Sequence, residues 1–320
     1  MTAIAFSSRS AGPLRALGAL LCAALLVGAS AGHAQDATAP TVASAPAELS
    51  GTLAKVRASA IIALGYRESS VPFSFLSPRK EPVGYSVELC KALVTSIENA
   101  INKSVTIRWV PVTSASRIDA VESGQIDLEC GSTTNNIERQ KRVAFSPTIF
   151  VSGTRLMVKR GSPVRSFRDL AGKKVVVTSG TTNEKALQDL NSRFKLRMDI
   201  LVSPDHAQSF DMVARGQVDA FATDDVLLQG LISQRGAKAD YVVLGDELSY
   251  DPYAIMFRKN DPQLAKVVRE AFQILAEDGE IERQYRQWFL RKLPTGESID
   301  LPMSAQLASI IEAMAVKPAE

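Results

Sequence analysis

The sequence contains few of the residues that usually hold metals. Its 320 residues include three cysteines and two histidines, and the motifs HExxH, GxxxxGK[ST] and GxGxxG are absent. Neither a four-cysteine nor a three-histidine zinc site can be assembled from the residues left after the predicted N-terminal cleavage described below. Nucleotide sites commonly use the missing glycine-rich loops. We therefore expect neither a metal nor a cofactor.

An excess of charge of one sign is also missing. The 37 basic and 34 acidic side chains give a formal net charge of +3, which is too small for the positive footprint of a nucleic-acid-binding protein. Hydrophobic residues make up 46% and charged residues 22% of the chain. This composition excludes collagen, a coiled coil, intrinsic disorder and a polytopic membrane protein. The length predicts about two domains.

The first 34 residues are typical of a secretory signal peptide. Two arginines precede an apolar run from Leu17 to Val27, and small residues follow as far as Ala34. A transmembrane helix needs about 20 apolar residues, so a membrane anchor is disfavoured. Cys22 follows two leucines rather than the small residues of a lipoprotein site. We expect cleavage after Ala34 and export to the periplasm.

Cleavage would leave two cysteines, Cys90 and Cys130, and one histidine, His206. An oxidising compartment permits a disulfide between the two cysteines. However, Cys90 lies on an apolar helix stripe and Cys130 ends a predicted strand, so two buried free thiols fit at least as well. The sequence leaves this pairing open.

Strands and helices alternate along the chain from about residue 52. The preceding stretch, 35–50, is rich in Ala, Pro, Thr and Ser and is typical of a flexible leader. The helix 85–101 is well supported, because Val87, Cys90, Val94 and Ile97 recur at steps of three and four. Predicted strands are 60–64, 105–110, 126–130, 148–159, 174–178, 198–202, 218–223, 241–244 and 254–258, and further predicted helices are 117–122, 183–190, 207–215, 226–234, 262–277 and 280–291. This order predicts an α/β fold with parallel-rich sheets.

Two segments with the same pattern indicate two related lobes. Residues 118–127 and 210–219 each read as a helix that ends at glycine, then Gln, then a strand that opens with Ile-Asp or Val-Asp. Common helix-to-strand loop chemistry explains the glycine equally well. Polar loops, 131–136 and 223–225, follow both strands at the edge where α/β sheets bind ligands. We therefore expect two lobes that face each other across a cleft.

Two strand ends carry features that favour an anion. Residues 175–184 read as a strand, a glycine-containing turn and a helix start with a Thr-x-x-Glu box from Thr181 to Glu184. The N–H groups of a helix start attract a carboxylate or phosphate, and the missing lysine argues against a nucleotide. A second short helix can start at Asn135-x-x-Glu138, where Arg139 can bind a carboxylate in a bidentate manner. Each motif alone fits an ordinary capped helix, but together they predict an anion site.

Other polar residues are predicted to reach the same edge of the sheets. They are Arg67 after the first strand, Ser114 and Arg117 after the third element, His206 before a helix, and Asp224 at a strand end. Each arginine alone fits a solvated surface, and Asp224 equally fits a helix N-cap. Together with Arg139 they would form a pocket of three guanidiniums, one carboxylate and one imidazole. Such a pocket suits a small dianion that carries one ammonium group.

Several long segments resemble a known family. They are 65–74 (GYRESSVPFS), 129–136 (ECGSTTNN), 138–141 (ERQK), 148–151 (TIFV), 153–156 (GTRL) and 175–182 (VVVTSGTT). Through them the chain resembles family 3 of the periplasmic solute-binding proteins of polar amino-acid ABC transporters, and within it the binders of glutamate and aspartate. The resemblance covers residues 52–290 almost without gaps and departs at Cys90 and beyond Asp300.

The resemblance implies a type II periplasmic-binding-protein fold, in which two α/β lobes are joined by two crossing segments. We place the crossings near Phe150 and Tyr250. The predicted boundaries are 1–34 for the signal peptide, 35–50 for the leader, 51–150 with 251–300 for lobe 1, 151–250 for lobe 2, and 301–320 for a C-terminal tail.

The resemblance also implies roles for the site residues. Arg139, with groups of Thr134 and Thr182 and with Thr181 nearby, would hold the α-carboxylate of the ligand, and Asp224 its ammonium. The acidic side chain would lie against Arg67, Ser114, Arg117, Ser132 and His206. The chain would be a monomeric binding component that closes around glutamate or aspartate and delivers it to an inner-membrane permease with its ATPase.

Three other classes of protein fit less well. The same fold resembles cyclohexadienyl dehydratases, and Ser132, His206 and Asp224 could form a triad, but the nucleophile elbow GxSxG is absent. A sensor module would need an anchor or output domain, for which residues 35–320 leave no room. A DNA-binding regulator would need a helix-turn-helix segment and no export signal. We expect a binding protein and not an enzyme.

Overall fold

A computed structural model describes residues 48–294 and 296–316. The predicted signal peptide, 1–34, and leader residues 35–47 lie outside the described residues. The last residues of the predicted leader, 48–50, precede a helix that the sequence analysis did not predict, α1 (Gly51–Ser59). None of the helices in the described ranges is long and apolar enough to span a membrane.

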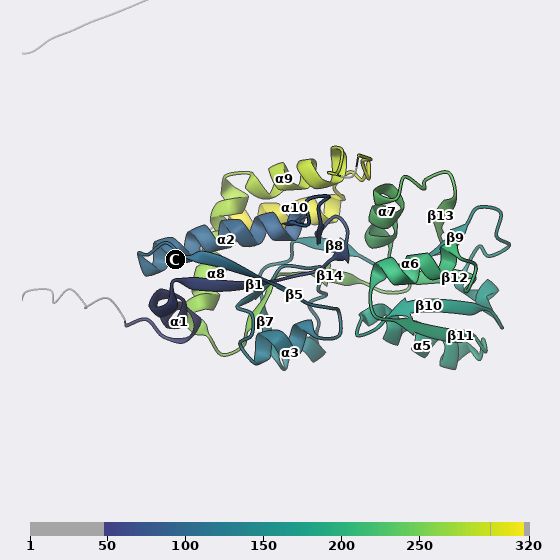
Figure 1. The fold of residues 1–320 in the computed structure, drawn as a ribbon, viewed down its shortest axis with the longest axis horizontal. Coiled ribbons are helices and arrows are strands. Elements are labelled where there is room, and N and C mark those ends of the chain that lie inside the picture. Colours follow the sequence, from purple (N-terminus) through teal and green to yellow (C-terminus); the bar gives the residue numbers. More distant parts are fainter. Residues whose placement is uncertain (1–47, 295, 317–320) are drawn as a thin grey trace, which may run out of the picture. The chain divides into compact units, whose positions relative to one another are not determined.

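The first five-stranded sheet is built from both ends of the described chain (Figure 1). Its strand order is β5 (Thr106–Pro111), β1 (Ile61–Tyr66), β6 (Leu128–Glu129), β15 (Met256–Arg258) and β7 (Val143–Phe145). β1 is parallel to β5 and β6, whereas β15 is antiparallel to β6 and β7. The chain reaches β15 on its return from the second sheet, so this strand runs against its neighbours.

The second five-stranded sheet lies wholly in the middle of the chain. Its order is β11 (Asp199–Ser203), β10 (Lys174–Thr178), β12 (Ala220–Asp224), β9 (Thr154–Lys159) and β13 (Tyr241–Leu244). β10 is parallel to β11 and β12, and β9 is antiparallel to β12 and β13. The predicted α/β class is confirmed. Both sheets are mixed, because strand–helix alternation predicts only the parallel part of each sheet.

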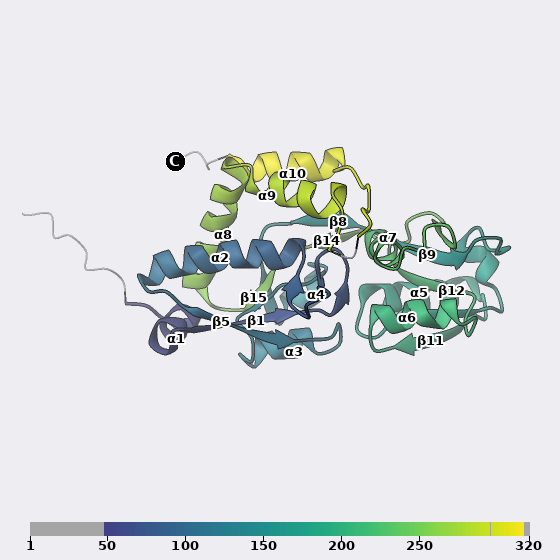
Figure 2. The same ribbon diagram turned by 45° about the horizontal axis from the view of Figure 1, so that its top comes forward.

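The helices flank the two sheets. They include the predicted α2 (Tyr85–Ile101), α3 (Arg117–Glu122), α5 (Thr182–Phe194), α6 (His206–Ala214), α7 (Asp225–Gln234) and α8 (Pro262–Glu277). The predicted helix 280–291 is instead α9 (Glu280–Tyr285) followed by a π-helical turn, η2 (Arg286–Leu290). α10 (Ala305–Ala315), in the segment predicted as a tail, buries Leu307 and Ile311 against α8 (Figure 2).

Several short elements were not predicted as strands or helices of these bounds. They are β2 (Ser69–Ser70), β3 (Ser74–Leu76), β4 (Pro82–Val83), the 3-10 helix η1 (Phe167–Leu170), and α4 (Ile137–Gln140) beside the cleft. Two to four residues are too few to show a period of hydrophobicity, which is why the pattern does not reveal them.

Two short antiparallel strands connect the lobes. They are β8 (Phe150–Ser152) and β14 (Asp251–Tyr253), which lie where the two crossing segments are predicted. The predicted strand 148–159 is therefore wrong as a single strand, because it divides at Gly153 into β8 and β9. A Cβ at Gly153 would lie 2.5 Å from the carbonyl oxygen of Ser249, so the backbone passes here only as glycine.

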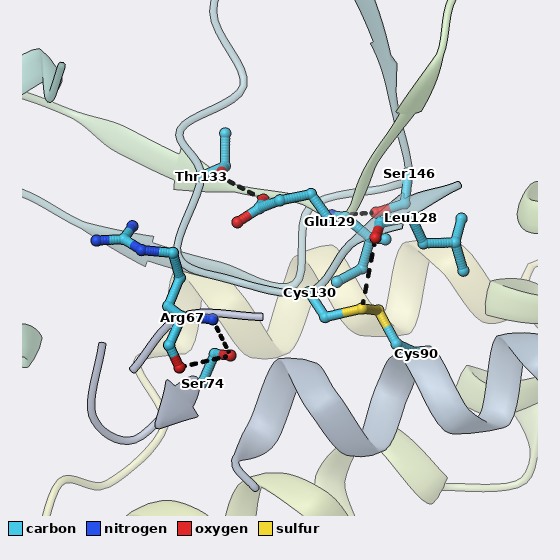
Figure 3. Close-up of a disulfide and its surroundings, with 9 residues drawn as sticks. Arg67, Ser74, Cys90, Leu128, Glu129, Cys130, Thr133 and Ser146 are labelled. Atoms are coloured by element: carbon cyan, nitrogen blue, oxygen red, sulfur yellow. Dashed lines mark hydrogen bonds between the residues drawn. A yellow bond between two sulfur atoms is a disulfide. The ribbon is translucent and has the colours of Figure 1, made fainter. Parts of the chain in front are cut away.

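A disulfide joins Cys90 of α2 to Cys130 at the end of β6 (Figure 3). The two Cα atoms are 6.1 Å apart, and both side chains are fully buried. The pairing that the sequence left open is therefore a disulfide. Each cysteine does lie on the apolar surface that the sequence indicates, but only the packing of α2 over β6 brings the two together.

Candidate ligand-binding site

Polar loops from both sheets meet around one small cavity. Its lining residues follow strand ends or begin helices, as expected of a ligand site in α/β sheets. They are Ser114, Arg117, Ser132, Thr134, Thr181, Thr182, Asn183, His206, Asp224 and Leu227. Eight of the ten predicted site residues thus line a single cavity. The other two, Arg67 and Arg139, are buried beside it, and both lie within electrostatic range of Arg117.

The three arginines of this site are almost completely buried. Arg67, Arg117 and Arg139 are 1%, 2% and 7% exposed. Burial lowers the pKa of Arg117, and burial followed by repulsion from Arg117 lowers the pKa of Arg67 and of Arg139 to about 9. Three guanidiniums in so small a volume repel one another unless anions lie among them. The site therefore favours an anionic ligand.

Some donors of these guanidiniums have no partner. Arg139 donates to the carbonyl oxygens of Thr134 and Gly180 at 2.9 and 3.3 Å, and Arg117 Nη1 donates to that of Ser132 at 3.2 Å. Within the part of the chain that the structure describes, Arg67 Nη1 and Arg117 Nε bond to nothing. Unpaired buried donors are costly, so these two nitrogens mark where a ligand acceptor would gain most.

The side-chain hydroxyls of Ser114 and Ser132 are also buried without a hydrogen-bond partner among the described residues. Both side chains are at most 5% exposed. They face the same cavity as Arg117. This side of the cavity therefore presents unpaired polar atoms from two hydroxyls and the Arg117 guanidinium, and Arg67 is buried beside it.

Asp224 supplies the carboxylate that lines the cavity. Asn183 Nδ2 donates to its Oδ1 at 2.6 Å, and the hydroxyl of Tyr253 donates to its Oδ2. Burial, followed by the charge of Asp251, raises the pKa of Asp224 to about 8. Asp224 occupies the N-cap position of α7, but its side chain makes no cap hydrogen bond. The capping alternative is therefore wrong for this side chain, which is free to meet a cation.

His206 is the first residue of α6 and is 1% exposed. Its Nδ1 lies 2.8 Å from the hydroxyl of Thr178. Burial, then the charges of Arg67 and Arg117, hold the pKa of His206 well below its ordinary value. The imidazole is therefore neutral, and it can offer a ligand a hydrogen bond but not a charge.

The predicted helix caps at the cavity need two corrections. Thr181 does cap α5, because its hydroxyl oxygen accepts from Glu184 N–H at 3.1 Å, but the Glu184 carboxylate accepts from Gly180 N–H rather than from Thr181. At α4 the cap is Asn136 rather than Asn135, since Asn136 Oδ1 accepts from Arg139 N–H at 2.9 Å. In each helix one contact of the predicted capping box is displaced by one residue, to Gly180 N–H at α5 and to Asn136 at α4.

Glu129 is a buried acid that sequence analysis missed. It is fully buried in β6; its Oε2 accepts from Thr133 Oγ1 at 2.6 Å, while its Oε1 has no partner among the described residues (Figure 3). Its charge acts on all three site arginines. A Cβ at Gly131 would lie 2.2 Å from this Oε1, so a larger residue there would displace the Glu129 carboxylate. An acid at the end of a buried strand was the available signal.

Asp251, Asn183 and Tyr253 were also missed. Asp251 Oδ1 accepts from the hydroxyls of Thr134 and Thr182 at 2.9 and 2.8 Å. Asn183 and Tyr253 both hold Asp224. None of the three lies in a sequence motif. Their contacts form only when the lobes and the crossing strands come together, so the sequence alone does not show them.

A family model for bacterial extracellular solute-binding proteins, family 3, matches residues 62–291. The chain belongs to this family. The glutamate/aspartate import solute-binding protein of Salmonella typhimurium is 40% identical over 302 residues, 93% of this chain and 96% of that protein. The L-glutamate/L-aspartate-binding protein of Pseudomonas aeruginosa is 41% identical over 88% of this chain and 94% of that protein. Family members of this kind work outside the cytoplasm.

Solved structures give the same fold. An ancestral amino-acid-binding protein, a precursor of cyclohexadienyl dehydratase, is 28% identical, with a TM-score of 0.64 over 74% of this chain and 99% of that protein. An arginine-binding protein of T. maritima has a TM-score of 0.67 at 24% identity and covers 75% of this chain and 99% of that protein. This solute-binding protein therefore has the predicted two-lobed type II fold.

The geometry does not form the triad considered in the sequence analysis. His206 pairs with Thr178, and the Ser132 hydroxyl has no partner in the described ranges, so no hydrogen bond joins the imagined nucleophile to a base. The relatives at about 40% identity are transport binding proteins. This solute-binding protein is not an enzyme.

A wider cavity, of about 710 Å³, is bordered by Arg67. It is lined by residues of both lobes, among them Lys80, Pro111, Asp205 and Gln208. Arg117, Ser114 and Ser132, whose side chains carry unpaired polar atoms, line the smaller cavity, whereas Arg67 lines the wider one. The smaller cavity is therefore the candidate ligand site.

Proposed function

We propose that this protein binds glutamate or aspartate between its lobes and delivers it to the permease of an ABC importer. The observation that carries the proposal is the set of three buried guanidiniums around a cavity that also holds one carboxyl group, Asp224. An acidic amino acid has the complementary charges, with two carboxylates and one ammonium. Relatives that are 40% and 41% identical are named for glutamate and aspartate.

The roles of the site residues belong to the same proposal. The α-carboxylate lies against Arg139 and the backbone N–H groups of Thr134 and Thr182, near Thr181, at the start of α5. The ammonium pairs with Asp224. The side-chain carboxylate takes up the unpaired donors of Arg67, Ser114, Arg117 and Ser132 and a hydrogen bond from His206.

Several further points complete the proposal. The protein acts as a monomer in the periplasm after cleavage of residues 1–34. Its lobes comprise 51–150 with 251–300 and 151–250, and its partner is an inner-membrane permease with an ATPase. Ligand shifts the hinge toward the closed form, which the permease recognises. Glutamate and aspartate differ by one methylene, which changes binding by about 1 to 3 kcal/mol, so the binding screen described below ranks them.

The test is a binding screen by calorimetry. The full protein is unfolded to remove bound ligand, refolded, and titrated with glutamate, aspartate, glutamine, asparagine and histidine. The proposal predicts dissociation constants of about 1 µM or lower for the two acids, equivalent to about −8 kcal/mol, and much weaker binding of the others. Preferential binding of an amide or of histidine would contradict it.

A further inference from the structure

Two side chains of the crossing strand β14 bond to residues that line the cavity. Successive residues of a strand point to opposite faces, so Asp251 and Tyr253 share one face and Pro252 takes the other. β14 pairs with β8, the second crossing strand, through Asp251↔Ser152 and Tyr253↔Phe150. Both side chains are buried, at 1% and 0% exposure.

Asp251 joins residues of the two lobes. Its Oδ1 accepts from Thr134 Oγ1, which follows a strand of the first sheet, at 2.9 Å. The same oxygen accepts from Thr182 Oγ1, at the start of α5 beside the second sheet, at 2.8 Å. The two hydroxyl oxygens lie 3.3 Å from each other. One carboxylate oxygen therefore holds the two lobes together at the cavity wall.

Each threonine hydroxyl has a single hydrogen to donate. When both hydrogens point to Asp251, neither hydroxyl can donate to a ligand carboxylate. The ligand is then left with Arg139 and backbone N–H groups, including the N–H of Thr182, which has no acceptor within α5 because it lies in the first turn. Asp251 thus determines which donors of Thr134 and Thr182 meet the ligand.

Tyr253 ties the same strand to the rest of the site. Its hydroxyl donates to Asp224, and its ring centroid lies 5.0 Å from that of Phe73 in the core. The loop 131–136, which carries Ser132 and Thr134, is attached to β14 and the residue after it by backbone hydrogen bonds. Asn135 N–H donates to Pro252 O at 2.7 Å, and Ala254 N–H donates to Thr133 O at 3.0 Å. A movement of β14 relative to either lobe would break at least one of these contacts.

We propose that β14 couples ligand binding to lobe closure, with Asp251 as the positioning residue that aligns Thr134 and Thr182. The inference rests on the proposed function only in that the ligand has an α-carboxylate. Asp251 accepts both hydroxyls at once only when the lobes approach each other. Its carboxylate therefore stabilises the closed arrangement and sets the spacing of the N–H groups for the ligand.

The first test compares Asp251→Asn with Asp261→Asn. Asp261 is also buried, but it accepts from Thr52 N–H and Leu264 N–H at the start of α8, and neither of these residues lines the cavity. Asp251→Asn should raise the dissociation constant for glutamate about tenfold to a hundredfold, mainly through faster dissociation in stopped-flow measurements, since hydrogen bonds to a charged group are lost. Asp261→Asn should lower stability and leave the affinity unchanged.

Two further readouts separate positioning from a merely structural role. The ligand-saturated Asp251→Asn variant should show a larger radius of gyration than the wild type in small-angle X-ray scattering. Thr182→Val should add little to Asp251→Asn in a double-mutant cycle, because both changes remove the same contact. Unchanged affinity and dissociation rate in Asp251→Asn, or full additivity, would overturn the proposal.

The Asp251→Asn test of coupling through β14 does not depend on which amino acid the protein binds. If the wild type binds glutamine or histidine rather than an acid, the function proposed above fails. The same comparison is then made with the amino acid that binds, since all of them carry the α-carboxylate. An effect of Asp251→Asn on that ligand would still support the coupling, and no effect would refute it.

Discussion

Asp224 shows how one residue links the site to pH. Burial raises its pKa to about 8, so at pH 6.5 it is mostly protonated before ligand arrives. An ammonium group placed beside it favours the charged form and lowers that pKa. Binding at pH 6.5 should therefore release about one proton from Asp224, and affinity should rise with pH until about pH 8.

Calorimetry in two buffers of different ionisation enthalpy measures this proton directly. At pH 6.5 the observed enthalpies should differ by the ionisation enthalpy of about one buffer proton, and the proton released should fall to about half as the pH is raised to 8, the pKa of Asp224. His206 is held neutral by burial and by Arg67 and Arg117, and it would take up a proton if its charge changed. Net proton uptake, or no exchange at pH 6.5, would contradict the role given to Asp224.

At the residue scale, the sequence indicated side chains that follow strand ends. Arg117, His206 and Asp224 stand directly after or before predicted elements, so the topology alone places them at one edge of the sheets. Asp251 could not be found in this way, because the hydroxyls that it binds, those of Thr134 and Thr182, lie 117 and 69 residues away in the chain. Glu129 stands at a strand end, but its role comes from its charge beside the three site arginines, which only the fold brings together.

At the element scale, prediction succeeded where hydrophobic periods are long. α2 and α8 have the predicted bounds, because a helix with one buried face repeats its apolar residues over four or five turns. The strand 148–159 failed because β-branched residues continue across Gly153, where the chain passes from β8 to β9. The direction of β15 also could not be predicted, since it depends on the return crossing from the second sheet.

The disulfide gives a prediction for α2 and β6. It closes a loop of about 40 residues, and in the chain-entropy treatment such a crosslink contributes up to about 4 kcal/mol to the free energy of unfolding. Replacing both Cys90 and Cys130 by alanine should lower that free energy by about 2 to 4 kcal/mol in urea denaturation. The Cys22→Ala change in the predicted signal peptide is the matched control and should have no effect on the mature protein.

The disulfide also affects the loop 131–136 beside the cavity. Cys130 is followed directly by Gly131 and Ser132, so the crosslink fixes the start of this loop on α2. Reduction of the wild-type protein should lower its unfolding free energy to that of the double variant. Equal unfolding free energies for the oxidised, reduced and double-alanine proteins would contradict this account of the crosslink.

At the scale of the whole molecule, the two lobes have little function apart from each other. Arg67, Arg117 and Arg139 come from one lobe, whereas His206 and Asp224 come from the other. Under the proposed function, the three arginines and Asp224 therefore meet the ligand from opposite lobes. This division explains how a ligand with both kinds of charge can bridge the lobes and shift the hinge equilibrium.

The central claim is that buried guanidiniums recognise the side-chain carboxylate of an acidic amino acid. The most direct measurement is calorimetry of the wild type, Arg117→Ala and the control Arg142→Ala with glutamate and glutamine. Arg142 pairs with Asp119 and Glu122 at the surface, so its loss should not change binding. Arg117→Ala should cost glutamate about 2 to 5 kcal/mol and glutamine much less. Equal losses for the acid and the amide would contradict the account.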